Sequence, residues 1–199
     1  MLKDKLKSYK IILASGSPRR QQFFRDFNFD FEIRIKSIEE IYPDNLQGVE
    51  ITNYLAELKA NAFDGELKKN EILVTSDTIV WLNNKALGKP KDYDDAFTIL
   101  KSLSNATHEV ITSVCFKTIK KTETLFEITK VTFNRLSDES IRYYLDYYKP
   151  FDKAGAYGIQ EWIGLIGITR IDGSYTNVVG LPTEKVYQYL IKYVGIKKE

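Results

Sequence analysis

Histidine and cysteine are almost missing from this chain of 199 residues, which carries one of each, His108 and Cys115. A Ser-His-Asp triad could be built only around His108, and a Cys-His pair only from these two residues. A structural zinc site needs about four Cys or His ligands, so such a site is excluded. One cysteine cannot form a disulfide within its own chain. Chemistry by this protein would therefore depend on carboxylates, lysines, arginines and hydroxyl groups, and a bound metal would be a hard cation held by oxygens.

Long hydrophobic runs and an excess of charge of one sign are missing as well. Lys and Arg number 29 and Asp and Glu 27, a net charge of +2, so we expect no nucleic acid partner. Basic residues gather at the ends, the last of them Lys197 and Lys198, in short runs that are typical of solvated tails. No apolar stretch approaches the roughly 20 residues of a membrane span or the roughly 7–15 of a signal peptide. We therefore expect no membrane partner and, with the single cysteine, a cytoplasmic location.

Apolar periodicity indicates strands that alternate with helices and are followed by a hairpin. The expected strands cover 10–15, 31–36, 72–75, 78–82, 108–119, 124–133 and 163–171, and the expected helices cover 17–27, 50–67, 92–103, 137–147 and the segment from Pro182. Asn83-Asn84 is typical of a hairpin turn. This order predicts a mixed α/β fold with a partly antiparallel sheet. Since no stretch has the composition of a linker, we expect residues 1–199 to form one domain of two lobes.

The segment Ser15-Gly16-Ser17-Pro18-Arg19-Arg20 has the pattern of an anion-binding loop. It follows an expected strand and opens an expected helix, whose N-terminus presents backbone N–H groups and the positive end of the helix dipole. Guanidinium groups match phosphate geometry, so the two arginines strengthen the preference for a polyphosphate. The segment is neither a Walker loop nor a G-x-G-x-x-G motif. The ordinary alternative is a capped helix with two solvated arginines.

Two groups of acids are candidates for the chemistry. Asp77 directly follows an apolar strand, a position where carboxylates line the crevice of α/β sheets. It could hold a divalent metal or deprotonate a water molecule, and the alternative is an aspartate that caps a turn. Glu39 and Glu40 are neighbouring acids in an expected loop, and a divalent cation would relieve their repulsion. Solvated loop acids have the same pattern.

Two lysines and a glutamine complete the candidates. Lys59 and Lys89 could each neutralise phosphate charge in a transition state, although either could be an ordinary surface lysine. Gln160 ends a segment, 152–160, whose small residues would let a ligand approach the backbone. Its amide offers both a donor and an acceptor, which suits the edge of a base, and the alternative is a loop amide without a ligand.

The remaining distinctive residues have structural interpretations. We interpret His108 as a hydrogen-bonding residue of the fold. Cys115 alternates with Val114 and Phe116 along an expected strand, so we interpret it as a small packed residue. The tyrosines of the helix at 137–148 have helical spacing, which favours packing in the core or at an interface such as that of a homodimer.

Five separated motifs resemble the Maf family of nucleotide pyrophosphatases. In family order they are Leu13-Ala14-Ser15-Gly16-Ser17-Pro18-Arg19-Arg20, Ser76-Asp77-Thr78-Ile79-Val80, Leu87-Gly88-Lys89-Pro90, Asp152-Lys153-Ala154-Gly155-Ala156-Tyr157-Gly158-Ile159-Gln160, and Gly173-Ser174-Tyr175 with Val179-Gly180-Leu181-Pro182. The resemblance extends from residue 10 to about residue 190. It implies a single Maf-like domain with an inosine-triphosphatase-like fold, in which a mixed sheet carries two lobes that flank a central cleft.

The resemblance also implies an activity. A nucleoside triphosphate would be hydrolysed between its α and β phosphates, giving a monophosphate and pyrophosphate, with Mg²⁺ or Mn²⁺ as the cofactor. Asp77 matches the family's catalytic acid, usually assigned as the proton acceptor. Glu40 matches a carboxylate near the metal, in less distinctive surroundings, so the implied metal ligands are Asp77 and Glu40.

The substrate-binding residues implied by the resemblance form two sets. Those of the triphosphate loop are Ser15, Ser17, Arg19 and Arg20. The basic cluster around the triphosphate adds Lys59 and Lys89, which together with Asp77 are the expected catalytic residues. Three positions track the base, and here they are Arg19, Thr78 and Gln160, the combination that resembles dTTP and UTP hydrolases. The subgroup with Trp, Gln and Glu resembles 7-methyl-GTP hydrolases. A glutamine amide can pair with a uracil-type edge, whereas a carboxylate would better hold the paired N–H donors of a purine.

Two rival functions remain open beside a dTTP and UTP pyrophosphatase. One is a non-enzymatic, nucleotide-binding regulator of septum formation, with which the family is associated. The other keeps the enzyme but broadens its substrates to modified nucleotides. The intact set of acidic and basic residues favours an enzyme. The chain departs from the family where Asp26-Phe27-Asn28 and Asn105 replace usual glycine-containing sequences, which affects local turns outside the candidate site.

Overall fold

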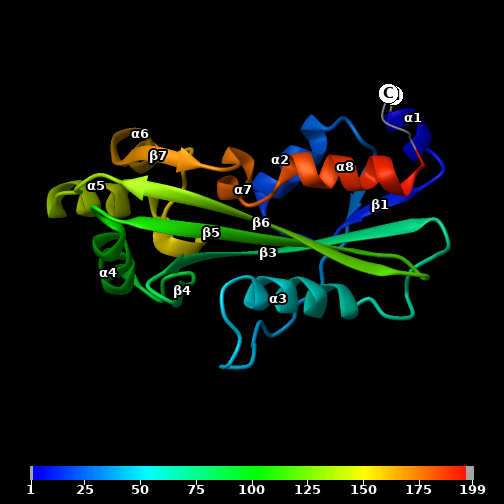
Figure 1. Ribbon diagram of the computed structural model, residues 1–199, viewed down its shortest axis with the longest axis horizontal. Coiled ribbons are helices and arrows are strands. Elements are labelled where there is room, and N and C mark those ends of the chain that lie inside the picture. The colour runs from blue at the N-terminus through cyan, green and yellow to red at the C-terminus, as the bar shows by residue number, and fades with distance from the viewer. Residues whose placement is uncertain (1, 196–199) are drawn as a thin grey trace. The chain divides into compact units, whose positions relative to one another are not determined.

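A computed structural model of the protein describes residues 2–195, so Lys197 and Lys198 lie outside the described residues (Figure 1). The helices are α1 (Leu2–Leu6), α2 (Pro18–Asp26), α3 (Val49–Asn61), α4 (Tyr93–Leu103), α5 (Asp138–Tyr148), the 3-10 helix η1 (Ala154–Ala156), α6 (Trp162–Gly167), α7 (Tyr175–Val179) and α8 (Thr183–Tyr193). The strands are β1 (Lys10–Leu13), β2 (Phe31–Ile33), β3 (Glu71–Leu82), β4 (Lys85–Leu87), β5 (Thr107–Lys117), β6 (Thr122–Phe133) and β7 (Ile168–Asp172). None of the helices described is long and apolar enough to cross a membrane.

The strands form one seven-stranded sheet in the order β2-β1-β3-β5-β6-β7, and β4 pairs with β3. β1 is parallel to both β2 and β3, whereas β4 and β7 are antiparallel to their neighbours. Asn83 and Asn84 both have positive φ angles, as a tight hairpin between β3 and β4 requires. The predicted mixed α/β fold is therefore confirmed.

The chain divides into two compact units. Unit 1 runs to Asp77 and adds Thr112–Phe126 and the chain from Gly180, and unit 2 comprises Thr78–Ile111 and Glu127–Val179. Three of the four boundaries fall inside strands β3, β5 and β6 rather than in loops. The organisation as a single domain with a central cleft stays a prediction.

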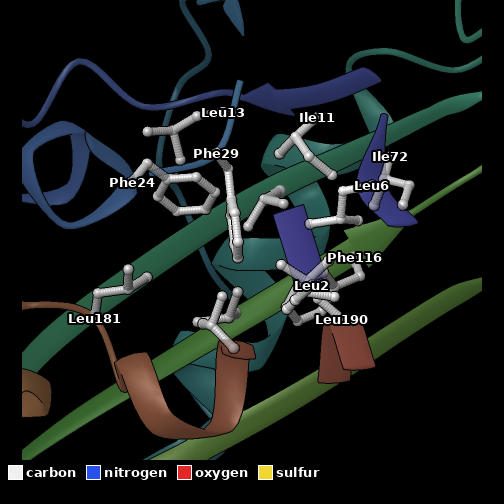
Figure 2. Packing of buried hydrophobic residues seen from close by; sticks show 13 residues of the cluster. Leu2, Leu6, Ile11, Leu13, Phe24, Phe29, Ile72, Phe116, Leu181 and Leu190 are labelled. Carbon is white, nitrogen blue, oxygen red and sulfur yellow. The ribbon is translucent and has the colours of Figure 1, made fainter. Parts of the chain in front are cut away.

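Strand β1 and the first part of β3 are buried on both faces, which explains why they are almost continuous apolar runs. One face contributes Ile11, Ile72 and Phe116 to a core that contains side chains of α1, α2 and α8 (Figure 2). The opposite face contributes Ile12 and Cys115 to a second core against α3. In Figure 1, α2 and α8 accordingly lie on one side of these strands and α3 on the other. The interpretation of Cys115 as a packed residue is confirmed, since its side chain is fully buried.

Unit 2 has its own core, in which His108 is buried. The imidazole Nε2 lies 2.7 Å from the hydroxyl oxygen of Tyr157, and its ring stacks on Phe133. These contacts confirm the structural role predicted for His108. Burial lowers the pKa of His108 from 6.5 to about 4, because the charged imidazolium would lose its hydration.

This burial predicts a pH dependence of stability. Between pH about 6.5 and about 4 the unfolded chain binds a proton at His108 that the folded chain does not. The contribution of His108 to the free energy of unfolding is therefore fully present above pH about 6.5 and decreases as the pH falls toward about 4. The contribution lost is on the order of 3 kcal/mol. Chemical denaturation should show that the free energy of unfolding decreases less between pH 7 and pH 4.5 for a His108→Gln variant than for the parent. Equal losses would contradict the prediction.

Several elements differ from those that the sequence predicts. The strand expected at 163–171 is wrong, because α6 occupies its first part and only β7 is extended. Gly164 of α6 lies close to the preceding turn, since a Cβ there would lie 2.0 Å from the Ile159 carbonyl oxygen. β3 does not stop at Asp77 but continues to Leu82. Helices α1 and α7 were not predicted.

The two departures from the family pattern have a simple explanation. Asn28 and Asn105 both have a φ of 57°, in the left-handed region that favours glycine. Asparagine is the side chain that tolerates this region best after glycine. The turns therefore keep their geometry without a glycine.

Candidate functional site

The loop between β1 and α2 has the expected form. The Ser17 N–H donates to Ser15 Oγ over 3.2 Å, and the Gln21 side chain donates to the Ser15 carbonyl oxygen over 3.1 Å. Ser17 is the N-cap residue and Pro18 begins the helix, as predicted, but the Ser17 hydroxyl makes no capping hydrogen bond. Ser15 therefore fixes the turn, and the N-terminus of α2 follows it directly.

Arg20 is held by two backbone carbonyl groups. Its Nε donates to Gly180 and its Nη1 to Ser76, both over 2.8 Å. Burial lowers the pKa of Arg20, and the nearby Asp77 carboxylate opposes this effect. The guanidinium thus joins the start of α2 to the strand that carries Asp77. Arg19, its neighbour on α2, is half-buried and adds positive charge to the same region.

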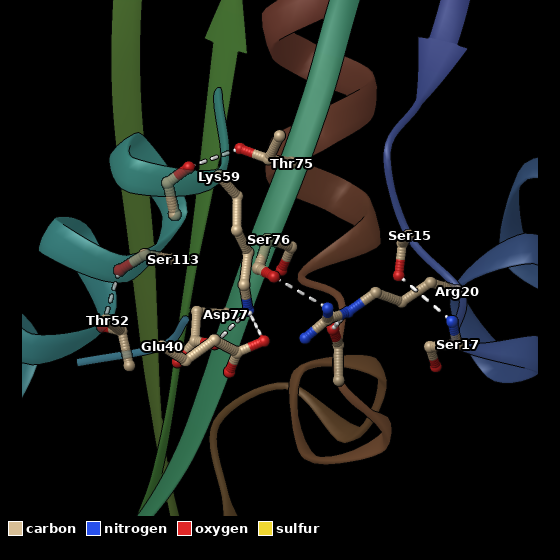
Figure 3. Close-up of polar contacts among 12 residues, drawn as sticks. Ser15, Ser17, Arg20, Glu40, Thr52, Lys59, Thr75, Ser76, Asp77 and Ser113 are labelled. Atoms are coloured by element: carbon tan, nitrogen blue, oxygen red, sulfur yellow. Dashed lines mark hydrogen bonds and ion pairs between the residues drawn. The ribbon is translucent and has the colours of Figure 1, made fainter. Parts of the chain in front are cut away.

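Asp77, Lys59 and Glu40 form a single ionic cluster (Figure 3). The Lys59 ammonium, on α3, lies 2.6 Å from Asp77 Oδ1 and 3.1 Å from Glu40 Oε1. The Asp77 side chain is 8% exposed and that of Glu40 is 46% exposed. A buried carboxylate is thereby paired with a cation, while a second carboxylate meets the same cation from solvent. This pairing holds the Asp77 carboxylate in a fixed position, as a general base requires.

The side chain of Thr75 fixes α3 against β3 beside this cluster. Thr75 Oγ1 donates to the Ala56 carbonyl oxygen over 2.6 Å, and both residues are fully buried. Thr75 and Asp77 lie on the same face of β3 because alternate residues of a strand share a face. Ala56 and Lys59 are nearly one turn apart on α3. The hydroxyl of Thr75 therefore sets the position from which Lys59 reaches Asp77.

We expect a Thr75→Val variant to lose about 1 kcal/mol of stability, since valine keeps the shape of threonine but not its hydrogen bond. Any reaction that needs Lys59 beside Asp77 should slow several-fold, because α3 would be free to shift Lys59 from Asp77. A Thr75→Ser variant retains the hydroxyl and should keep the parental rate. Thermal unfolding and initial rates measure the two effects, and equal rates for the two variants would refute this role.

The cluster is suited to a divalent cation that is shared with a ligand. Among residues 2–195, no group of three or more His, Cys, Asp or Glu side chains could hold a metal by itself. Asp77 and Glu40 already share one cation, the Lys59 ammonium, so their oxygens are close enough to act on a common charge. Mg²⁺ is commonly bound by one or two carboxylates together with substrate phosphates and water. The donor set fits that arrangement.

The other predicted site residues belong to unit 2. Lys89 is exposed, and the adjacent Gly88 carbonyl oxygen accepts a hydrogen bond of 3.0 Å from the Gly155 N–H. The loop of Lys89 is therefore tied to the segment that carries Gln160. Gln160 is exposed in a turn, and Thr78 is half-buried directly after Asp77 on β3. All three residues belong to unit 2, and their roles in substrate binding and catalysis stay predictions.

The structure thus brings one part of the predicted set together and adds to it. Unit 1 contains Ser15, Ser17, Arg19, Arg20, Glu40, Lys59 and Asp77. Among these, Lys59 contacts both Glu40 and Asp77. Sequence analysis did not find Thr75. The signal available was its position two residues before Asp77, which places both on one strand face.

The chain is similar to known proteins over almost its whole length. Residues 10–193 match the family described as Maf-like protein. A protein of Flavobacterium psychrophilum named dTTP/UTP pyrophosphatase is 72% identical, over 97% of this chain and 99% of that protein. One of Christiangramia forsetii with the same name is 53% identical, over 96% and 97% of the two chains.

Among solved structures, a nucleoside-triphosphatase, or dITP/XTP pyrophosphatase, of Mycobacterium abscessus is 12% identical over 96% of this chain and 100% of that chain, with a TM-score of 0.47. The match to the family covers most of the chain, and the relatives are similar over almost their whole length. The chain therefore belongs to the Maf-like protein family.

Proposed function

We propose that this protein hydrolyses dTTP and UTP to the monophosphate and pyrophosphate. The observation that carries the proposal is the buried Asp77 carboxylate, held 2.6 Å from the Lys59 ammonium with Glu40 on the same cation. It brings a carboxylate that can act as a base and a positively charged group together, which phosphoanhydride hydrolysis needs. Relatives that are 72% and 53% identical carry the name dTTP/UTP pyrophosphatase, which supports the choice of substrate.

Each residue of unit 1 has a role in the proposed reaction. Asp77 orients a water molecule and accepts its proton as the oxygen attacks the α-phosphorus. The bond between the α-phosphorus and the bridging oxygen breaks, and pyrophosphate leaves. Lys59, with Arg19 and Lys89, stabilises negative charge on the phosphate oxygens. Arg20 contributes its charge while its bonds to two carbonyl groups hold α2 in place.

The backbone N–H groups at the start of α2 provide a further site for phosphate oxygens. Ser15 and Ser17 present hydroxyl groups in the same loop, and the helix dipole adds to the charge of the arginines. Asp77 and Glu40 would hold Mg²⁺ or Mn²⁺, which when bound supplies Lewis acid polarisation of the phosphate.

The base would be selected by Arg19, Thr78 and Gln160. An amide side chain presents an acceptor and a donor side by side, and the uracil edge presents a ring N–H and a carbonyl oxygen. Gln160 can therefore form two hydrogen bonds with uracil or thymine.

The test is pyrophosphate release from purified protein. With Mg²⁺ or Mn²⁺, we expect dTTP and UTP to be turned over faster than ATP, GTP and CTP. A panel that adds 5-methyl-UTP, pseudo-UTP and 7-methyl-GTP would separate this function from broad hydrolysis of modified nucleotides. Tight nucleotide binding without release of pyrophosphate would instead support a regulator of septum formation. Activity restored by one metal after treatment with a chelator would identify the cofactor.

Three further points stay predictions. A cytoplasmic location is expected from the sequence, and so is a role in septum formation from the family association. A homodimer is the third, because Tyr143 and Tyr147 of α5 are exposed and their rings contact one another at an interplanar angle of 33°, with centroids 4.6 Å apart. Sedimentation analysis of the purified protein tests the last point.

A further inference from the structure

The segment that carries Gln160 is a tight turn whose first and last residues are joined by a hydrogen bond. The Glu161 N–H donates to the Gly158 carbonyl oxygen over 3.0 Å, so Ile159 and Gln160 are the two central residues of a β-turn. Ile159 is buried and Gln160 is exposed. The side chain of Ile159 therefore packs in the interior, and that of Gln160 faces solvent.

A single phenol group joins the two ends of this turn. The hydroxyl of Tyr144, on α5, accepts a hydrogen bond of 3.0 Å from the Gly158 N–H and donates one to the Glu161 carboxylate. Tyr144 is fully buried, and burial together with the Glu161 carboxylate raises its pKa, so the hydroxyl remains protonated and able to donate. Both partners of this hydroxyl belong to the turn rather than to α5 itself.

Two further observations show that the turn is built around Glu161. The other carboxylate oxygen of Glu161 lies 3.1 Å from the ammonium of Lys153, whose side chain is only 11% exposed. A Cβ atom at Gly158 would lie 2.8 Å from the carboxylate carbon of Glu161, so only glycine leaves room for this side chain to fold beneath the turn. The Glu161 carboxylate is therefore held by the Tyr144 hydroxyl and the Lys153 ammonium, in a space that exists because residue 158 is a glycine.

The turn is also supported from behind. The Glu161 carbonyl oxygen accepts the Gly164 N–H over 2.9 Å, and Gly164 lies directly against the Ile159 carbonyl. Helix α6 therefore begins at the turn and packs on it. The backbone of Gln160 is therefore supported by α6, while its side chain is exposed.

From this arrangement we propose that Tyr144 and Glu161 are positioning residues that set the base selectivity of the enzyme. The inference rests on the proposed function, in which Gln160 binds the base. By fixing the turn, the two residues hold the Gln160 amide in one position within unit 2. A pyrimidine then meets the amide, and a purine, whose corresponding edge lies farther from its sugar, does not.

UTP and GTP form a matched pair of substrates for this question. Uracil and guanine both present a ring N–H beside a carbonyl oxygen, so a glutamine amide can bond to either in the same way. They differ in how far that edge lies from the sugar. The ratio of kcat/KM for UTP to that for GTP therefore reports the position of Gln160 rather than its hydrogen-bonding pattern.

A Tyr144→Phe variant removes only the hydroxyl. We expect the UTP to GTP ratio to fall about tenfold, the effect of one hydrogen bond of ordinary strength, through a higher KM for UTP at an unchanged kcat. A Glu161→Gln variant keeps an acceptor for Tyr144 but weakens the bond to Lys153, so its ratio should fall less. Tyr147→Phe is the matched control on the same helix, because Tyr147 is 73% exposed, and its ratio should equal the parental one.

The outcomes separate the inference from the function on which it rests. If the parent protein releases no pyrophosphate from UTP, the proposed function fails. If the parent is active and Tyr144→Phe lowers the melting temperature but keeps the UTP to GTP ratio, Tyr144 is merely structural and the inference is overturned. The same holds if kcat falls equally for both substrates. Should Tyr144→Phe not fold, an unchanged ratio in Glu161→Gln would overturn the inference.

Discussion

An Asp77→Asn variant is expected to release pyrophosphate from dTTP about 10²–10⁴ times more slowly than the parent, the range typical for loss of a general base. Asparagine has nearly the same shape and can still accept a hydrogen bond from Lys59, but it cannot take a proton from water. The KM should change less than kcat, because the lost interaction is made in the transition state. Initial rates at saturating dTTP measure this effect.

The control for Asp77 is an exposed aspartate of the same unit. Asp30 precedes β2 and is exposed, so Asp30→Asn should keep the parental rate. Thermal unfolding must also be compared, because Asp77 is buried and its replacement leaves the Lys59 ammonium with Glu40 alone. A folded Asp77→Asn protein with the parental kcat would disprove the catalytic role.

A Lys59→Met variant is expected to lose about 10²–10³-fold in kcat/KM, as when one preorganised group is removed from a site of developing charge. Methionine fills a similar volume in the half-buried position but leaves Asp77 and Glu40 facing each other without a cation. Initial rates over a range of dTTP concentrations measure the loss in kcat/KM.

Matched variants distinguish this effect from simple loss of structure. Lys69→Met, at an exposed position of the same unit, should keep the parental kcat/KM. Lys59→Arg keeps the charge and should retain more of the rate than Lys59→Met. A folded Lys59→Met protein with the parental kcat/KM would contradict the proposed role of Lys59.

The sequence predicted the elements that have a clear period. The alternation of Ile11, Ile12 and Leu13 between two cores explains why β1 was recognisable as an apolar run. The prediction of a strand at 163–171 was wrong for the opposite reason, because its first part has no clear period. Six apolar and glycine residues are too few to distinguish a short helix from a strand, and the contact of Gly164 with Ile159 that selects the helix is tertiary.

The candidate site was predictable in its residues but not in its contacts. Motifs identified Asp77 and Lys59, yet the two are separated along the chain, and their ion pair depends on how α3 lies on β3. That register is fixed by Thr75, whose hydroxyl binds a helix carbonyl. Sequence patterns report which face of an element is apolar, but they do not report how far one element slides along another.

Strand β3 has a consequence for how such a protein can change its substrate. It continues without interruption through Ser76, Asp77 and Thr78, and in a strand consecutive side chains point to opposite faces. The acid proposed for catalysis and the residue proposed to sense the base are therefore neighbours in sequence but point away from each other. A mutation at Thr78 can alter the fit to the base while the surroundings of Asp77 stay intact. Substrate preference could thus drift by single substitutions in a lineage without any intermediate that has lost its chemistry.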